Sequence, residues 1–200
     1  MTKFLLIRHA TTDSVGKRLS GRLAGINLNE NGRRQANELA EQLKGLSIAA
    51  IYSSPLERTV QTADAISDVL GLEPVVCEDF VEINFGEWTN LTFQELDSEP
   101  QFKRFNSFRS FTRIPGGESM LEAQLRMVKG IEKLCMNHPD ETVIIVSHSD
   151  LIKATVTYYS GIHLDMFQRI EISPASVSII EIGKDYAVIQ LVNYTGTLKV

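Results

Sequence analysis

The sequence predicts an α/β fold: a three-layer α/β/α sandwich with a mostly parallel central sheet and an antiparallel edge. Apolar strand-like runs alternate with amphipathic helical patterns along most of the 200 residues. The most apolar and β-branched run, residues 142–146, lacks polar alternation, which is typical of a buried central strand. Near the end, two apolar runs flank Gly183-Lys184-Asp185, a pattern that favours an antiparallel hairpin.

The first strand covers residues 4–7 and leads directly into Arg8 and His9. Residues 11–31 are rich in Gly, Ser, Thr, Asn and Arg, and they predict a long irregular loop over the carboxyl end of the sheet. A helix follows and ends at Gly45. Its apolar residues recur with the spacing of one helical face: Ala36, Leu39, Ala40 and Leu43.

A second strand, residues 48–52, is followed by a helix start signal. Ser54 is expected to cap this helix, and Glu57 to complete a capping box. Arg58 would then lie in the first turn, and Gly71 would end the helix.

The middle of the chain predicts a short strand at residues 73–76, then an acidic and aromatic loop over residues 78–88. Residues 89–111 are polar, aromatic and weakly periodic, which favours short helices that form a lid. Ser119 and Glu122 repeat the capping-box pattern and begin another helix. The apolar residues expected on that helix are Leu121, Leu125, Val128 and Leu134.

The central strand at residues 142–146 also ends in a histidine, His148, and a helix follows it. Residues 167–172, 177–182 and 187–192 then predict three more strands. No repeat or linker interrupts the chain, so we expect a single domain over residues 1–200 with a small lid-like insertion around residues 89–115.

Composition limits the partners. The net charge is −5, from 20 basic and 25 acidic residues, so no basic surplus exists to bind nucleic acid or an anionic membrane surface. No apolar run approaches a membrane span and no export signal is present, so we expect a cytoplasmic protein. Cys77 and Cys135 are isolated and are interpreted as small hydrophobic residues.

Four cationic or basic side chains follow strands whose carboxyl ends meet at one sheet edge: Arg8, His9, Arg58 and His148. Arg8 and His9 alone would fit a solvated loop equally well, but together the four favour a pocket for a compact dianion, and phosphate fits best. Neighbouring cations favour neutral histidine, whose lone pair can attack phosphorus. Glu82, beside Val81, Ile83 and Phe85, has surroundings that raise a carboxyl pKa, so it is the candidate proton donor.

Five motifs, in order, resemble those of the histidine phosphatase superfamily, which has the phosphoglycerate mutase-like fold. The family hallmarks are L-x-R-H-G, S-S-P-L-x-R-x-x-Q-T-A, E-x-x-F-G-x-W, P-G-G-E-S and S-H-G. The matching stretches begin at Leu6, Ser53, Glu82, Pro115 and Ser147. Parts of the chain are most similar to a bacterial subgroup labelled only as probable phosphomutases. The match covers nearly the whole chain.

The resemblance implies residue roles. It makes His9 the phosphorylated nucleophile, Glu82 the proton donor, and Arg8, Arg58 and His148 the phosphate pocket. We also expect Ser20, Gly21 and Ser149 to bind substrate. Many relatives carry an asparagine where this chain has Val15, and the contact it makes would be missing or supplied by Thr11, Ser14 or Ser20.

The favoured function is therefore a phosphatase that hydrolyses a small phosphorylated metabolite through a phosphohistidine intermediate. Two alternatives stay open: phosphoryl transfer of the phosphoglycerate mutase type, which the short interval between Glu82 and Pro115 disfavours, and a non-catalytic phosphate-binding protein, which would not need Glu82. The histidines lack metal-ligand spacing, so neither a metal nor another cofactor is expected. The sequence does not identify the substrate. It also leaves the oligomeric state open, and a homodimer is one of the states that it allows.

Two sets of residues near the proposed lid have less specific interpretations. Arg109 and Arg113 are expected to be solvated, with a second anionic group of the substrate as the less favoured alternative. Four phenylalanines at three-residue spacing are interpreted as lid packing: Phe102, Phe105, Phe108 and Phe111.

Overall fold

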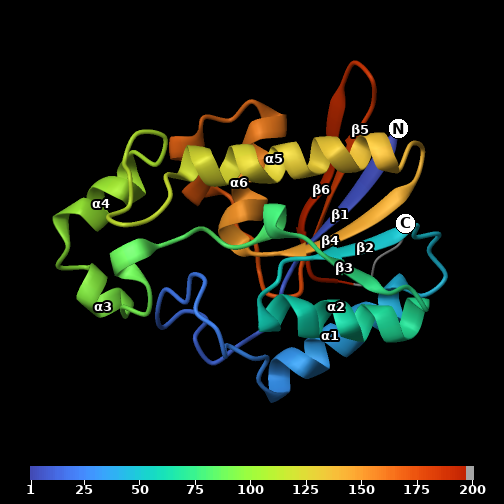
Figure 1. Ribbon diagram of the computed structural model, residues 1–200, viewed down its shortest axis with the longest axis horizontal. Helices are drawn as coiled ribbons and strands as arrows, with labels where there is room; N and C mark the ends of the chain where they lie inside the picture. Colours follow the sequence, from blue (N-terminus) through green and yellow to red (C-terminus); the bar gives the residue numbers. More distant parts are fainter. Residues whose placement is uncertain (197–200) are drawn as a thin grey trace.

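The computed structural model describes residues 1–196, which form one six-stranded sheet with helices on both faces (Figure 1). The strand order is β3-β2-β4-β1-β5-β6. The first four strands are parallel to one another, whereas β5 pairs antiparallel with β1, and β6 pairs antiparallel with β5. The strands are β1 (Thr2–Arg8), β2 (Ala50–Ser53), β3 (Pro74–Val76), β4 (Thr142–Ser147), β5 (Val177–Ile182) and β6 (Ala187–Tyr194). The predicted α/β sandwich with its antiparallel edge is confirmed.

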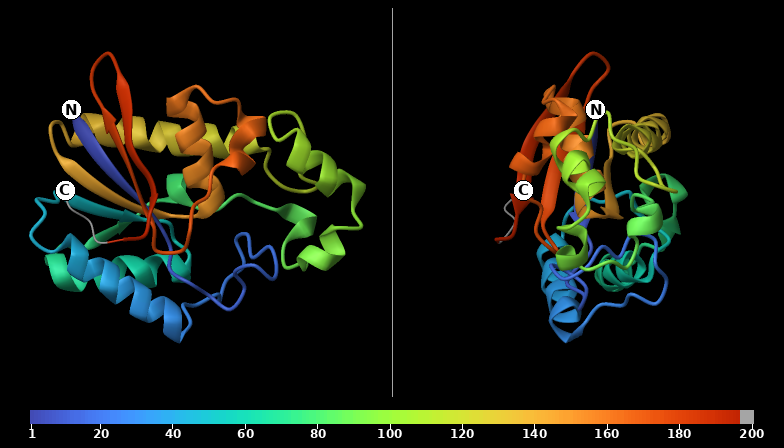
Figure 2. Two further views of the ribbon diagram at one scale, coloured as in Figure 1. Left: turned by 180° about the vertical axis from the view of Figure 1, so that it is seen from behind. Right: turned by 90° about the vertical axis from the view of Figure 1, so that its left-hand side faces the viewer.

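The two helical layers pack on opposite faces because side chains alternate along each strand. Leu5 and Ile7 of β1 lie in the same buried cluster as α1 (Glu30–Leu43) and α2 (Glu57–Leu70). Phe4 and Leu6 lie in the cluster that contains residues of α5 (Met120–Asn137) and α6 (Ser149–Ser160). Figure 2 shows the sheet between these two layers.

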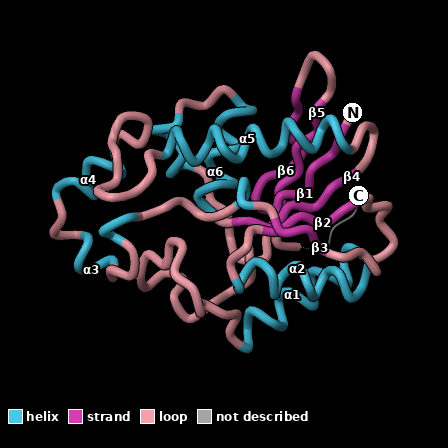
Figure 3. The backbone as a smooth tube through the Cα atoms, in the orientation of Figure 1, coloured by secondary structure: helices cyan, strands magenta, loops and turns pink. Residues whose placement is uncertain are grey.

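Parallel pairing brings the carboxyl ends of the central strands to one edge. Arg8 is in register with Ser147, and Ser53 with Val146. The long loop after β1 and the short helices α3 (Phe93–Leu96) and α4 (Pro100–Ser107) lie beyond this edge, where Figure 3 shows most of the irregular chain. Three 3-10 helices complete the described chain: η1 (Glu78–Phe80), η2 (Gly86–Trp88) and η3 (Leu164–Arg169). No helix of residues 1–196 is long and apolar enough to cross a membrane.

The strand predicted at residues 167–172 is wrong. The chain forms η3 there, and the Phe167 side chain is fully buried beneath it. The carbonyl of Ile172 accepts hydrogen bonds from Arg8 Nη1 at 2.6 Å and from the Ser149 hydroxyl at 3.4 Å. Long-range side-chain donors therefore take the place of a strand partner at this carbonyl.

The capping box predicted at Ser54 and Glu57 is also wrong. Helix α2 begins at Glu57, its N-cap is Leu56, and no side chain caps it. The Ser54 hydroxyl lies 2.8 Å from His148 Nε2, so it serves a distant residue.

The apolar face predicted for α5 is partly wrong. Leu121 and Leu125 are 48% and 52% exposed, whereas Val128 and Leu134 are buried as predicted. The buried face is instead built largely on a second set of residues, which are Met120, Ala123, Met127 and Ile131. Leucines on the solvent side made the wrong face look apolar.

The capping box predicted at the start of α5 is confirmed: Ser119 accepts from the Glu122 amide, and Glu122 accepts from the Ser119 amide. We expect Ser119→Ala to lower the free energy of unfolding by about 1 kcal/mol, because an orphan helix donor loses its acceptor. Urea denaturation measures this change. Ser107→Ala, at an exposed helix end, is the control and should stay within about 0.5 kcal/mol; equal losses in the two variants would contradict the cap's contribution.

Candidate active site

The four basic residues predicted to share the sheet edge do come together. Arg8 ends β1, His9 follows it, Arg58 is the second residue of α2, and His148 precedes α6. The rings of His9 and His148 lie 5.4 Å apart between centroids. His9, Arg58 and His148 are 5%, 2% and 0% exposed, so their charges and hydrogen bonds act away from bulk water.

The His9 ring has a defined tautomer. Its Nδ1 lies 2.7 Å from the carbonyl oxygen of Ala10, and a carbonyl can only accept, so Nδ1 carries the proton. Burial and then the cations of Arg58 and Arg8 hold the pKa of His9 well below its usual range. The ring is therefore neutral near pH 7, and Nε2 keeps its lone pair.

The two arginines are held by backbone carbonyls but keep spare donors. Arg8 Nη1 donates to Ile172 at 2.6 Å, and Arg58 Nη2 donates to Gly21 at 2.8 Å. Within residues 1–196, Arg8 Nε and Arg58 Nη1 are buried nitrogens without a hydrogen-bond partner. Unsatisfied buried donors are rare in folded proteins, and two on neighbouring cations indicate an anion site.

His148 is oriented through both ring nitrogens. Its Nδ1 accepts from Arg58 Nη2 at 3.3 Å, which leaves Nε2 to donate to the Ser54 hydroxyl at 2.8 Å. Burial, Arg58 and His9 lower the pKa of His148 well below its usual range. The structure therefore holds two neutral histidines beside two cationic arginines.

Glu82 lies next to this group, with a carboxyl oxygen 3.8 Å from His148 Nδ1. Burial, and then the nearby carboxylate of Asp150, raise the pKa of Glu82 to about 7, although Arg58 and Arg8 act in the opposite direction. Its neighbours Ile83 and Phe85 are buried, as the sequence suggested. A carboxyl group with this pKa can both release and accept a proton near neutral pH.

A cavity of about 180 Å³ opens onto these groups. Arg8, His9, Arg58 and Glu82 line it, and so do the predicted substrate-binding residues Ser20, Gly21 and Ser149. His148 lies behind the lining and is fully buried. Six further lining residues were not predicted from the sequence: Thr12, Gly16, Arg18, Leu19, Phe93 and Asp150. Thr12 and Asp150 stand close to the two histidines in sequence, and this proximity is the signal that could have identified them.

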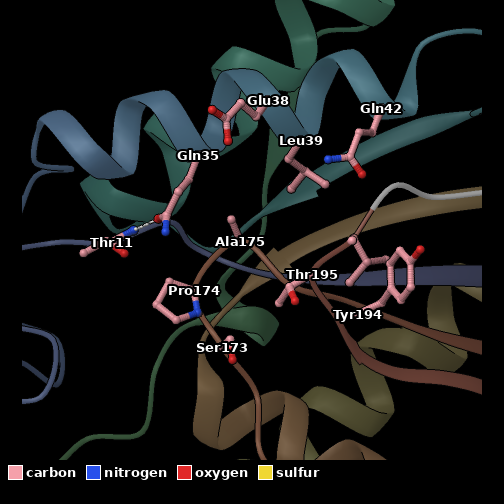
Figure 4. A pocket seen from close by; sticks show the side chains of 12 residues that line it. Thr11, Gln35, Glu38, Leu39, Gln42, Ser173, Pro174, Ala175, Tyr194 and Thr195 are labelled. Carbon is pink, nitrogen blue, oxygen red and sulfur yellow. Dashed lines mark hydrogen bonds between the residues drawn. The ribbon is translucent and has the colours of Figure 1, made fainter.

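A second cavity, of about 330 Å³, lies between α1 and the segments around residues 174 and 195. Figure 4 shows Thr11 on its wall, where the Thr11 amide donates to Gln35. Of the three residues proposed to replace the family asparagine, Thr11 therefore lines the other cavity and not the one at the sheet edge. Ser14 and Ser20 line the smaller cavity, as does Val15 itself.

The solvated position expected for Arg109 is wrong. Its guanidinium is buried between the rings of Phe105 and Phe167, 4.4 and 4.2 Å from their centroids. Arg109 Nη1 lies 3.5 Å from Asp150 Oδ2. The Asp150 carboxylate on the cavity wall is therefore paired with a buried cation. Arg113 is exposed and pairs with Glu122, as expected of a solvated arginine.

The predicted lid packing holds for half of the phenylalanines. Phe102 and Phe105 are buried and contact the ring of Trp88, whereas Phe108 and Phe111 are exposed. Within residues 1–196, the site included, no group of three or more His, Cys, Asp or Glu residues is arranged to hold a metal ion.

We expect Arg58→Ala to weaken binding of inorganic phosphate by roughly tenfold to a hundredfold, because charge-assisted hydrogen bonds to a buried anion are lost. Isothermal titration calorimetry measures the affinity. Arg113→Ala, which removes an exposed arginine outside the cavity, is the matched control and should bind phosphate like the wild type. Unchanged affinity in Arg58→Ala would remove this residue from the anion site.

Comparison with known sequences identifies relatives over almost the whole chain. The sequence model of the histidine phosphatase superfamily (branch 1) matches residues 4–195. Phosphoserine phosphatase 1 of Hydrogenobacter thermophilus is 32% identical over 199 residues, which cover 98% of this chain and 93% of that protein. A bifunctional protein of Mycobacterium tuberculosis is 37% identical over 201 residues, and the chain spans 55% of its length.

Solved structures agree with the sequence relatives. A phosphoserine phosphatase from Entamoeba histolytica, in complex with phosphoserine, has a TM-score of 0.87 and 30% identity with full coverage of both chains. A mycobacterial glucosyl-3-phosphoglycerate phosphatase has a TM-score of 0.85 and 25% identity over 96% of this chain and 98% of that one. The five motifs occur in order, the family model matches residues 4–195, and the fold is shared with solved phosphatases. The chain therefore belongs to the histidine phosphatase superfamily.

Proposed function

We propose that this protein is a phosphatase that hydrolyses a small phosphate monoester through a phosphohistidine at His9. The observation that carries the proposal is the combination of a neutral His9, whose Nε2 keeps its lone pair, with spare buried donors on Arg8 and Arg58. These groups line one cavity together with a carboxyl group of raised pKa. A site that only bound phosphate would not need that carboxyl group.

In the first step, His9 Nε2 attacks phosphorus, and the bond between phosphorus and the ester oxygen breaks. The leaving alkoxide takes the proton of the Glu82 carboxyl group. Arg8 and Arg58 stabilise the charge on the transferring group, for which positioning and electrostatics supply most of the catalysis. His148 contributes by accepting a hydrogen bond from Arg58 Nη2, which orients that guanidinium. Ser20, Gly21 and Ser149 line the cavity where the substrate enters.

In the second step, water attacks the phosphohistidine and gives its proton to the Glu82 carboxylate. The bond between phosphorus and Nε2 breaks, inorganic phosphate leaves, and both His9 and Glu82 return to their starting states. The cycle therefore needs no metal ion and no cofactor.

The substrate is a compact phosphorylated metabolite. The cavity of about 180 Å³ suits a small leaving group, and related proteins are named phosphoserine phosphatase. Phosphoserine is thus the first natural ester to test. We also propose that residues 1–200 form one domain with residues 89–115 as a lid; the last four residues lie outside the described part. The cytoplasmic location stays a prediction from the sequence, which leaves the oligomeric state open.

We expect the protein to release phosphate from p-nitrophenyl phosphate in the presence of EDTA, and His9→Ala to abolish this release, because the nucleophile is lost. Colorimetric phosphate release measures both. His163→Ala removes an exposed histidine outside the cavity and should keep the activity. A separate reaction with 3-phosphoglycerate and its bisphosphate tests mutase transfer, and rapid interconversion without hydrolysis would contradict the proposed phosphatase.

The pH dependence should report Glu82. Because the donor must be protonated, kcat/KM for phenyl phosphate should fall as pH rises through about 7, the pKa of Glu82. His9 is already neutral there because its pKa is lowered, so its titration does not contribute. Glu82→Gln should lower kcat/KM about a hundredfold and remove this decline. Persistence of the same decline in Glu82→Gln would assign it to another group.

A further inference from the structure

We propose that Glu118 is a positioning residue for Glu82: its carboxylate holds two arginines that fix the backbone on which the proton donor sits. The inference rests on the proposed function, because it assigns Glu118 to the proton-donating step of that reaction. Glu118 does not line the cavity and therefore acts through other residues.

The Glu118 side chain gathers donors from three separate segments. Its Oε2 accepts from Arg22 Nη2 at 2.8 Å, in the loop after β1, and from the Asn84 amide at 2.9 Å, two residues beyond Glu82. Arg126, on α5, approaches both oxygens, with its Nε 3.3 Å from Oε1 and its Nη2 3.2 Å from Oε2. One carboxylate thus joins the loop, the helix and the chain that carries Glu82.

Arg22 and Arg126 both donate hydrogen bonds to the backbone around Glu82. Arg22 Nε donates to the carbonyl of Glu82 at 2.8 Å. Arg126 Nη1 donates to the carbonyls of Val81 at 2.8 Å and Asp79 at 2.9 Å. The peptide bonds before and after residue 82 are therefore both fixed, and the Asn84 amide adds a third point.

Glu118 supplies the negative charge in this group. The other acceptors of Arg22 and Arg126 are backbone carbonyls, which are neutral and cannot offset two neighbouring cations. The Glu118 side chain is only 21% exposed, so water screens the pairs less than at an open surface. Without this carboxylate, repulsion between the arginines would loosen their hold on the backbone.

The backbone around Gly86 and the backbone around Gly117 lie in close contact. An added Cβ at Gly86 would meet the carbonyl of Pro115 at 2.0 Å, and one at Gly117 would meet that of Asn84 at 2.3 Å. The Glu118 amide also donates to the carbonyl of Asn84 at 2.9 Å. The backbone of the turn before Glu118 therefore packs directly against the backbone of the segment that follows Glu82. The ion pairs of Glu118 with Arg22 and Arg126 add a second connection to the Glu82 segment.

Placement matters for a proton donor because it must reach the leaving oxygen within hydrogen-bonding distance. A displacement of about 1 Å can cost roughly a hundredfold in rate. A misplaced donor affects esters unequally: a nitrophenolate leaves readily without a proton, whereas the more basic phenolate needs one. The ratio of kcat/KM between phenyl phosphate and p-nitrophenyl phosphate therefore isolates the function of Glu82 from that of the phosphate pocket.

We expect Glu118→Gln to lower kcat/KM for phenyl phosphate about tenfold while p-nitrophenyl phosphate changes less than about twofold. Inhibition by inorganic phosphate should stay within about twofold, because the anion site is intact. Glu82→Gln in the same assay defines the full loss of proton donation. Glu122→Gln is the matched control: it removes an exposed charge four residues away, and glutamine keeps the capping box.

Arg22→Met is the second variant, because it removes the hydrogen bond to Glu82 from an exposed loop residue and decides the question if Glu118→Gln does not fold. It should show the same selective loss. Equal losses on both esters, or no loss on either, in a variant that melts like the wild type would overturn the inference. Failure of the proposed function is recognised separately: the wild type would then hydrolyse neither ester, or His9→Ala would keep the activity.

Discussion

The buried guanidinium of Arg58 is the interaction on which the rest of the site depends. It lies between the carbonyl of Gly21 and the ring of His148, and its charge acts on His9, His148 and Glu82. It contributes to the lowered pKa values of His9 and His148, and it opposes the burial that raises the pKa of Glu82. A single fixed cation therefore helps to set the protonation of the proposed nucleophile His9, of its neighbour His148 and of the proposed proton donor Glu82.

Burial of that cation requires compensation, which comes from the negative charges of Glu82 and Glu57 and from the carbonyl of Gly21. The compensation is incomplete, since Nη1 keeps no partner within the described residues. A dianion supplies what is missing, so the free site favours its ligand before any contact with the rest of the substrate.

The sequence predicted the architecture and the site well, because both depend on local patterns. Apolar runs end where strands end, and parallel strands bring such ends together, which is why Arg8, His9, Arg58 and His148 were found before their geometry was known. The errors came where a distant partner decides the local structure. Ser54 carries every local signal of a helix cap, yet its hydroxyl contacts His148. Arg109 stacks between Phe105 and Phe167, which no spacing along the chain reveals.

The position of β1 has a consequence for biosynthesis. This strand lies between β4, at residues 142–147, and β5, at residues 177–182, and the Arg8 side chain is held by the carbonyl of Ile172. A nascent chain that has emerged only as far as α2 thus carries Arg8, His9 and Arg58 but lacks the strands that flank β1. Its apolar first strand must stay unpaired until the last third of the chain is translated, which is a period of exposure to aggregation and to chaperones. A translation product that ends before β4 therefore lacks His148 and both strand neighbours of β1, so neither the sheet nor the proposed site can be complete.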